Sequence, residues 1–136
     1  MLNRFLAPAT EPVFALMRII VGLLFAFHGM QKIFGMLTEF QPPVGSQLWI
    51  GGVIELVTGL LIAGGLFTMW AAFLASGTMA GAYVQYHWKF AFGTSFWPAV
   101  NQGEPALVYA FLFLYIACRG PGPASIDGKR AATVSG

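Results

Sequence analysis

The sequence predicts an all-α membrane protein, a bundle of four transmembrane helices with both termini in the cytoplasm. Hydrophobic residues make up 57% of the 136 residues and charged residues only 9%, against about 45–50% and about 25% in average soluble domains. Three apolar stretches, 13–34, 48–67 and 69–90, approach the roughly 20 residues that cross a bilayer as a helix. A shorter fourth runs over 106–118. One membrane domain, 13–119, is therefore expected.

Prolines and glycines set the expected helix ends. Pro8 and Pro12 separate an N-terminal segment, 1–12, from the first helix, because proline is tolerated in a first turn but not inside a helix. Two prolines and a glycine predict an extended outer loop over 36–47. The turn near Thr68 is so short that the second and third spans must be antiparallel neighbours.

The fourth span is expected to begin near residue 103. Asn101 to Glu104 has the spacing of a capping box, and Pro105 suits a first helical turn. The aromatic stretch 88–103 is either an interfacial lid or an aromatic belt. After Arg119, a Gly-Pro-Gly-Pro run ends the helix. The remainder, 120–136, is expected to be a cytoplasmic tail, disordered from Ala131.

Charge placement predicts the orientation. Only Lys32 and Lys89 lie in the loops after the first and third spans, whereas the other basic residues lie near the termini: Arg4, Arg18, Arg119, Lys129 and Arg130. The positive-inside rule then puts both termini in the cytoplasm. The first span is too long for a secretory signal, so we expect it to be retained. No basic face suggests nucleic acid, and the single Cys118 excludes an internal disulfide.

Glu55 is the most informative residue, because it is the single charge within the apolar stretch 48–67. An ionisable group at that depth costs at least about 2.5 kcal/mol and normally faces a bundle interior or a wet cavity. Helical rise puts it level with residues 25–28 of the first span and about 15 Å from the level of Arg18. Glu55 is therefore the candidate catalytic residue, and Arg18 is a poor partner for it.

Polar residues of the other spans are expected to meet Glu55 in the outer half of the bundle. Helical spacing puts Lys32 on the face of the first span that carries glycines, and Tyr83 and His87 on one stripe of the third. The candidate ligand-binding residues are His28, Lys32, Tyr83, His87, Asn101 and Glu104. Close helix contacts are expected at the glycines, namely Gly51, Gly52, Gly59, Gly77 and Gly81. No metal site is predicted.

Each candidate also has a structural explanation. Arg18 is expected to be an inner anchor whose guanidinium reaches the headgroups. Lys32 could be an outer-interface anchor, Glu104 a capping carboxylate, and the two histidines hydrogen-bonding residues at helix ends. Glu55 could make a buried structural contact, either with Lys32 or His28 or, when protonated, with a backbone carbonyl.

Several segments, taken together, resemble the DoxX family of small bacterial membrane proteins over residues 13–127. They are Arg18 with 29–35, and then 49–59, 80–87, 96–104 and 120–127. The resemblance implies a multi-pass four-helix bundle of the bacterial cytoplasmic (inner) membrane, often described as a subunit of quinone-linked or other membrane oxidoreductase complexes. Partner subunits would then supply the oxidation of substrate. The family's matching positions are Arg18, Lys32, Glu55, His87, Asn101 and Glu104.

The leading hypothesis is a non-catalytic or co-catalytic subunit whose outer pocket receives a quinone headgroup. Lys32 or His28 would donate hydrogen bonds to the ring oxygens, and Glu55 would relay protons. Phe25 and Tyr83 would border the ring.

The sequence is also compatible with three other functions. Haem b held by His28 and His87 is the least favoured. A binding or transport protein for a small hydrophobic molecule is the second, and transport would require a homo-oligomer. The third is a purely structural assembly subunit, which Gly77 and Gly81 favour.

Overall fold

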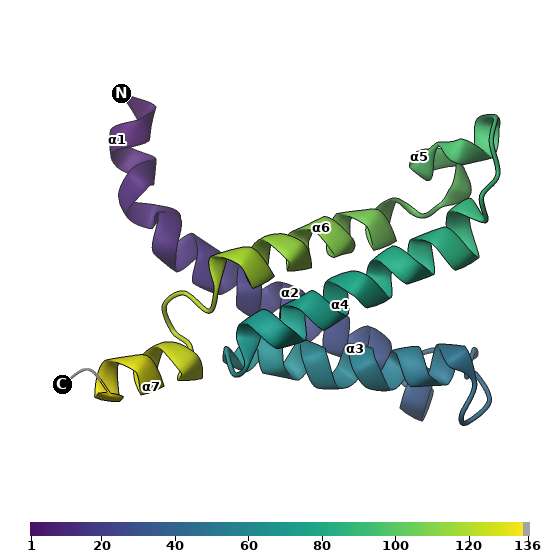
Figure 1. The fold of residues 1–136 in the computed structure, drawn as a ribbon, viewed down its shortest axis with the longest axis horizontal. Helices are drawn as coiled ribbons and strands as arrows, with labels where there is room; N and C mark the ends of the chain where they lie inside the picture. Colours follow the sequence, from purple (N-terminus) through teal and green to yellow (C-terminus); the bar gives the residue numbers. More distant parts are fainter. Residues whose placement is uncertain (135–136) are drawn as a thin grey trace.

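The computed structural model describes residues 1–134, and every regular element within them is a helix (Figure 1). Among the described residues, the long helices are α2 (Thr10–Phe34), α3 (Gln47–Gly64), α4 (Thr68–Ala82) and α6 (Glu104–Arg119). The shorter ones are α1 (Leu2–Leu6), α5 (Pro98–Asn101) and α7 (Ile126–Val134). The all-α prediction is confirmed.

The first helical path starts earlier than the prolines predict. A 3₁₀ turn at Ala7–Ala9 joins α1 to α2 without a loop, so most of the segment 1–12 is helical and α2 begins at Thr10. Pro8 lies at the start of the 3₁₀ turn, and Pro12 lies in the first turn of α2. Proline is tolerated at both places because the first amides of a helix have no intrahelical partner.

Two expectations near the C-terminus are wrong. Gly103 is the N-cap of α6, and no side chain caps that helix; the Asn101 carboxamide oxygen instead accepts the Gly103 amide at 2.8 Å, so no capping box forms. Disorder was expected from Ala131, but residues 131–134 belong to α7. Residues 135–136 of the expected tail lie outside the described residues.

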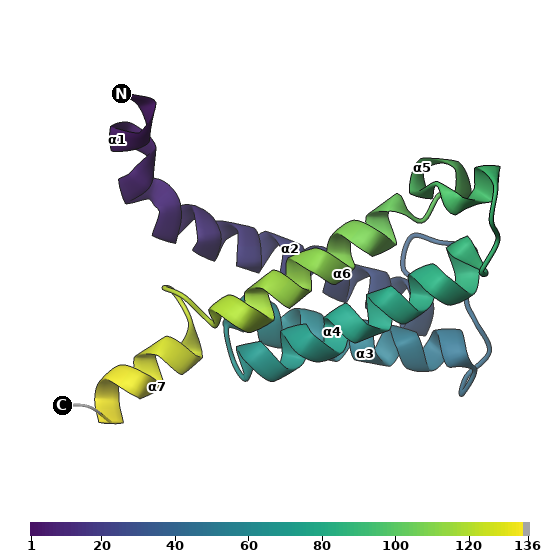
Figure 2. The ribbon, with the colours of Figure 1, turned by 45° about the horizontal axis from the view of Figure 1, so that its top comes forward.

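The bundle consists of two helix pairs, α2 with α3 and α4 with α6, which meet along α3 and α4 (Figures 1 and 2). Glycines let the backbones of the first pair touch. A Cβ added to Gly22 would lie 2.7 Å from the Gly59 carbonyl oxygen, and one added to Gly59 would lie 2.6 Å from that of Gly22. Gly29 and Gly52 repeat this approach farther along the pair. Such contacts exclude any side chain at these positions.

Small residues also pack the second pair, and aromatic rings join the pairs. Ala72 and Ala110 are buried, and the Ser76 hydroxyl donates to the Ala110 carbonyl at 2.7 Å. Phe25 of α2 reaches α6, where its ring centroid lies 4.7 Å from that of Phe113. This cluster forms the centre of the hydrophobic core.

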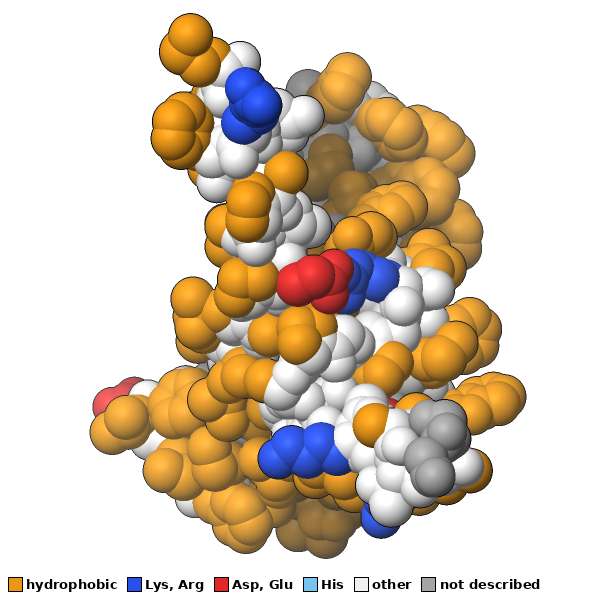
Figure 3. Space-filling view, turned by 90° about the vertical axis from the view of Figure 1, so that its left-hand side faces the viewer, with side chains coloured by type: hydrophobic (Ala, Val, Ile, Leu, Met, Phe, Trp, Pro, Cys, Tyr) orange, Lys and Arg blue, Asp and Glu red, His pale blue; other side chains and the backbone are white. Residues whose placement is uncertain are grey.

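The surface agrees with a lipid environment. Hydrophobic side chains cover most of the face drawn in Figure 3, and charged groups on it are few. Two stretches of the described chain, Leu2–Phe34 and Gln47–Gly64, are long and apolar enough to cross a membrane. The helix α4 has 15 residues but continues as a π-helix over Tyr83–Trp88, and α6 has 16. Four spans and cytoplasmic termini stay predictions.

Arg18 fastens the C-terminal segment to the end of the bundle where α3 turns into α4, here called the tail end. The side chain is fully buried, so it does not reach toward headgroups as expected. Its guanidinium donates hydrogen bonds of 2.6 to 3.2 Å to four carbonyl oxygens, those of Ile62, Ala63, Pro123 and Ala124. The first two belong to the last turn of α3, whose carbonyls have no partner within the helix.

Asp127 completes this attachment by capping α4. Its carboxylate accepts the amides of Phe67 at 3.1 Å and Thr68 at 2.9 Å, and the Thr68 hydroxyl at 3.0 Å. Burial alone would raise the pKa of Asp127, but these hydrogen bonds and the charge of Arg130 together lower that pKa below its ordinary value. The tail is thus held by a buried cation and by an anion at a helix N-terminus.

We expect Gly59→Ala to lower the stability of the purified protein by about 1–3 kcal/mol, the usual cost of forcing an extra group into a packed interface. Gly51→Ala on the same helix is the control, because nothing lies within 4 Å of a Cβ at Gly51. That variant should be neutral or more stable by up to about 1 kcal/mol, the helix propensity of alanine over glycine. Thermal unfolding in detergent measures both, and equal effects would contradict the packing account.

Asp127→Ala should cost about 0.5–2 kcal/mol at neutral pH, as loss of a helix cap does. Because the folded-state pKa lies below the ordinary value of 3.8, this stabilisation is fully present above that pH and is lost as the pH falls below it. The difference between wild type and variant should therefore shrink in acid. Unfolding curves between neutral and acidic pH test this, with Glu39→Ala in the exposed loop as the control. A difference that stays constant with pH would contradict it.

Candidate functional site

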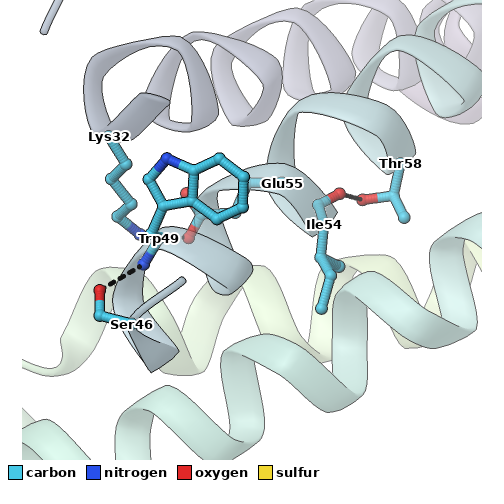
Figure 4. A network of polar contacts seen from close by, with 6 residues as sticks. All are labelled: Lys32, Ser46, Trp49, Ile54, Glu55 and Thr58. Carbon is cyan, nitrogen blue, oxygen red and sulfur yellow. Dashed lines mark hydrogen bonds and ion pairs between the residues drawn. The ribbon is translucent and has the colours of Figure 1, made fainter. Parts of the chain in front are cut away.

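An ion pair between α2 and α3 lies at the other end of the bundle, where α2 ends and α6 begins, here called the pocket end. The Lys32 ammonium lies 2.5 Å from Glu55 Oε1, and Figure 4 shows the lysine extending from α2 toward the carboxylate on α3. The Glu55 side chain is 5% exposed and that of Lys32 is 27% exposed. The pair is one of the three structural contacts that the sequence left open for Glu55.

The local sequence explains why the two groups meet. A Cβ added to Gly52 would lie 2.7 Å from the Lys32 Cβ, so the glycine gives the lysine stem room to pass across α3. The Ser46 hydroxyl accepts the Trp49 amide at 3.3 Å and caps the start of α3 (Figure 4). Glu55 then lies one turn beyond the close contact and points back toward α2.

The second oxygen of Glu55 has no partner. Within the described residues, Oε2 is buried and receives no hydrogen bond. A carboxylate oxygen left unsatisfied in the interior costs about 1–3 kcal/mol or more. Glu55 is also one of the residues that line a cavity of about 210 Å³ between the helices. The lining includes Phe25, His28, Lys32, Glu55, Met79, His87, Gln102, Pro105, Ala106 and Tyr109.

His87 reaches this cavity from a π-helix. The segment Tyr83–Trp88 departs from α-helical geometry, which happens often at functional sites. His87 Nδ1 lies 3.2 Å from the Asn101 carbonyl oxygen. Because a carbonyl only accepts, we assign the proton to Nδ1. In the neutral ring, Nε2 is then an acceptor.

Asn101 and Tyr83 position the loop instead of lining the cavity. The Asn101 carboxamide donates to the Ser95 carbonyl at 3.0 Å and lies 3.5 Å from the Tyr83 hydroxyl. The Tyr83 ring packs against Gly103, where an added Cβ would lie 2.6 Å from Tyr83 Cδ2. Both residues therefore fix the connection that orients His87, a role different from the expected contact with a ligand.

The remaining two candidates lie farther from Glu55 Oε2. Glu104 is exposed and borders a separate surface hollow with Val21 and Tyr109. His28 is exposed at the cavity rim, and its ring stands nearly perpendicular to that of Tyr109 at 6.4 Å. The structure thus pairs Lys32 with Glu55, brings His87 and His28 to the same cavity lining, and leaves Glu104 outside that lining.

A groove between α3 and α4 opens from the same cluster. It encloses about 400 Å³ and shares Lys32, Glu55, Met79 and His87 with the cavity. Three of its lining residues are glycines, namely Gly51, Gly77 and Gly81. A Cβ at any of the three would find nothing within 4 Å. These glycines therefore leave space along the groove, whereas close helix contacts were expected of them.

Several lining residues were not predicted from the sequence. Met79, Gln102 and Tyr109 border the cavity, and the Gln47 carboxamide donates to that of Gln85 at 2.6 Å across the groove. Only Tyr109 carried a signal, as an aromatic residue with a polar tip inside the fourth apolar stretch. Across residues 1–134, no group of three or more His, Cys, Asp or Glu is placed to hold a metal ion.

The architecture and this cluster define a class: a small helical membrane protein with a polar cavity between its helices. Comparison with known proteins agrees. The sequence model of the DoxX family matches residues 13–88. A protein of Haemophilus influenzae described as an uncharacterized protein is 40% identical over 119 residues, which are 85% of this chain and 88% of the relative. No solved structure matches. The chain belongs to the DoxX family of small bacterial membrane proteins.

We expect Lys32→Met to destabilise the protein by about 3–5 kcal/mol, because it keeps the alkyl stem but leaves Glu55 as a buried charge without its partner. Lys32→Met with Glu55→Gln should recover most of the loss. A double-mutant cycle from thermal unfolding measures the coupling, with Lys89→Met on the exposed loop as the control. Equal stability of wild type and Lys32→Met would contradict an energetically important pair.

Proposed function

We propose that this DoxX protein is a subunit of a quinone-linked oxidoreductase complex in the bacterial inner membrane and binds a quinone-type headgroup at its pocket end. Its four spans would be α2, α3, α4 with its π-helical extension, and α6. Partner subunits would carry the substrate-oxidising chemistry. This chain's own residues would bind and orient the ring within the bilayer.

The unpaired Glu55 Oε2 is the observation that carries this proposal. This oxygen is buried without a hydrogen-bond donor among the described residues, and it belongs to a residue that lines a cavity. The cavity also has aromatic and apolar walls, including Phe25 and Met79. Apolar walls with a few converging polar groups are what a small-molecule site requires.

Charge placement supports an outward-facing pocket. Basic groups gather at the tail end and near the termini, including Arg119, Lys129 and Arg130, whereas the pocket end carries Lys32 and Lys89. The positive-inside rule favours the tail end in the cytoplasm. A ring bound at Glu55 would then lie in the outer half of the membrane.

A purely structural role in assembly is the second candidate. Gly77 and Gly81 lie four residues apart on α4, and a Cβ at either position would meet nothing. Membrane helices use such small-residue faces to pack against a neighbour. In that case a helix of a partner subunit would pack on this face. Substitutions in the cavity would then not change the turnover of the complex.

The quinone proposal is tested by extracting the bound small molecules from protein purified out of native membranes, combined with native mass spectrometry and an absorption spectrum. We expect a quinone to copurify. Glu55→Leu should lower affinity for the reduced form, the quinol, at least about tenfold, because the quinol hydroxyls can donate to the carboxylate and a hydrogen bond to a charged group contributes about 1.5–3 kcal/mol. Glu104→Leu, outside the cavity, should bind as wild type does.

Three results would contradict the proposal. Phospholipid as the sole bound molecule would favour the structural role, and a haem absorption band would favour the haem alternative. Retention of the quinol by Glu55→Leu at wild-type affinity would remove the cavity from the account.

A further inference from the structure

The geometry points to a site that selects its ligand by redox form. Glu55 Oε2 and His87 Nε2 favour the quinol, whose ring carries hydroxyl donors, over the oxidised quinone. The groove between α3 and α4 receives the ligand's apolar chain. This inference rests on the proposed function and deepens it. It concerns binding alone, and no electron transfer by this chain is part of it.

The hydrogen-bonding capacity of the two groups gives the first step. Lys32 occupies Glu55 Oε1 at 2.5 Å, while Oε2 is buried and unpaired. A carboxylate that is paired with an ammonium is ionised, so Oε2 can only accept. The ligand must therefore donate a hydrogen bond to it.

His87, which lines the same cavity, carries a second acceptor. Its Nδ1–H is directed to the Asn101 carbonyl oxygen, which leaves Nε2 with a lone pair when the ring is neutral. Both groups line the 210 Å³ cavity. Two acceptors match the two hydroxyl groups of a quinol, whereas quinone carbonyls bring only lone pairs and leave both acceptors unsatisfied. Sites built to bond a hydroxyl reject analogues that lack it.

The groove supplies space for a chain. Glycines in this protein fall into two sets: Gly22 and Gly59 touch a neighbouring backbone, whereas Gly77 and Gly81 face open space. The open set lines a groove of about 400 Å³ that begins at the Lys32–Glu55 pair. The other walls include aliphatic residues such as Ile54. An alkyl or isoprenoid chain attached to a ring at Glu55 would lie along these glycines.

The experiment uses the full-length protein in phosphatidylcholine nanodiscs under anaerobic conditions. Equilibrium dialysis measures binding of a short-chain benzoquinone and of the same compound reduced to its quinol. Wild type should bind the quinol at least about tenfold more tightly, since each hydrogen bond to a charged group contributes about 1.5–3 kcal/mol.

Glu55→Gln gives the sharpest result. The amide oxygen of the glutamine would stay on the Lys32 ammonium, so the NH₂ group would take the place of Oε2 and turn an acceptor into a donor. The preference should then fall to unity or reverse toward the quinone. Glu104→Gln should keep the wild-type ratio. Equal binding of both forms by wild type, or an unchanged ratio in Glu55→Gln, overturns the selection while leaving quinone binding itself intact; binding of neither form defeats the proposed function as well.

Chain placement is tested separately with Gly81→Leu. We expect that variant to lose at least about tenfold in affinity for a quinol with a ten-carbon chain, which corresponds to about 1.4 kcal/mol, and to bind the tailless ring as wild type does. Ala80→Leu is the matched control, because Ala80 is the exposed neighbour of Gly81 and its side chain does not line the groove. Equal losses for both ligands, or no loss for the longer one, would remove the groove from the proposal.

Discussion

The contact of the α2 and α3 backbones at their glycines is the constraint on which the rest of the structure depends. Gly22 and Gly29 place α2 directly against the carbonyls of Gly59 and Gly52, and that approach lets Lys32 reach a carboxylate inside α3. A bulkier interface would hold the helices farther apart, near the usual 8–10 Å or beyond. The ion pair, the cavity and the unpaired oxygen all follow from this single close contact.

The two ends of the bundle treat their buried charges differently. At the tail end, the Arg18 guanidinium donates hydrogen bonds to four carbonyl oxygens, which fix it between α3 and the tail. Only its Nε has no partner among the described residues. At the pocket end, Glu55 has one partner for two oxygens. Four hydrogen bonds from both terminal nitrogens of Arg18 hold α3 and the tail together, whereas Glu55 is held through one oxygen only and lines a cavity. This asymmetry supports a structural role for the tail end and the proposed binding site at the pocket end.

Helical periodicity in the sequence predicted the relative depths of residues in the bundle. It did not predict features that depart from regular α-helix. Counting along antiparallel helices put Glu55 level with residues 25–28 of α2 and kept Arg18 away from it. It could not foresee that Tyr83–Trp88 becomes a π-helix, or that the Asn101 carbonyl at the end of α5 contacts His87. The hydrogen-bond partners of Arg18 could not be predicted either, because the carbonyls of Pro123 and Ala124 lie more than a hundred residues away in the chain.

The sequence pattern does not predict which glycines contact a neighbouring helix and which line the groove. Gly52 and Gly59 share a face with Glu55 and touch α2, whereas Gly51, one residue before Gly52, faces open space. A spacing of four residues does not show whether a glycine contacts a neighbouring helix or lines an open groove, because glycine, which has no side chain, suits both places. What lies opposite each glycine makes the difference: Gly51, Gly77 and Gly81 line a groove that Glu55 also lines, and the Oε2 atom of Glu55 is buried without a partner. In a bilayer core without water, such an oxygen must find its donor inside the protein or on a ligand, and the described residues offer none.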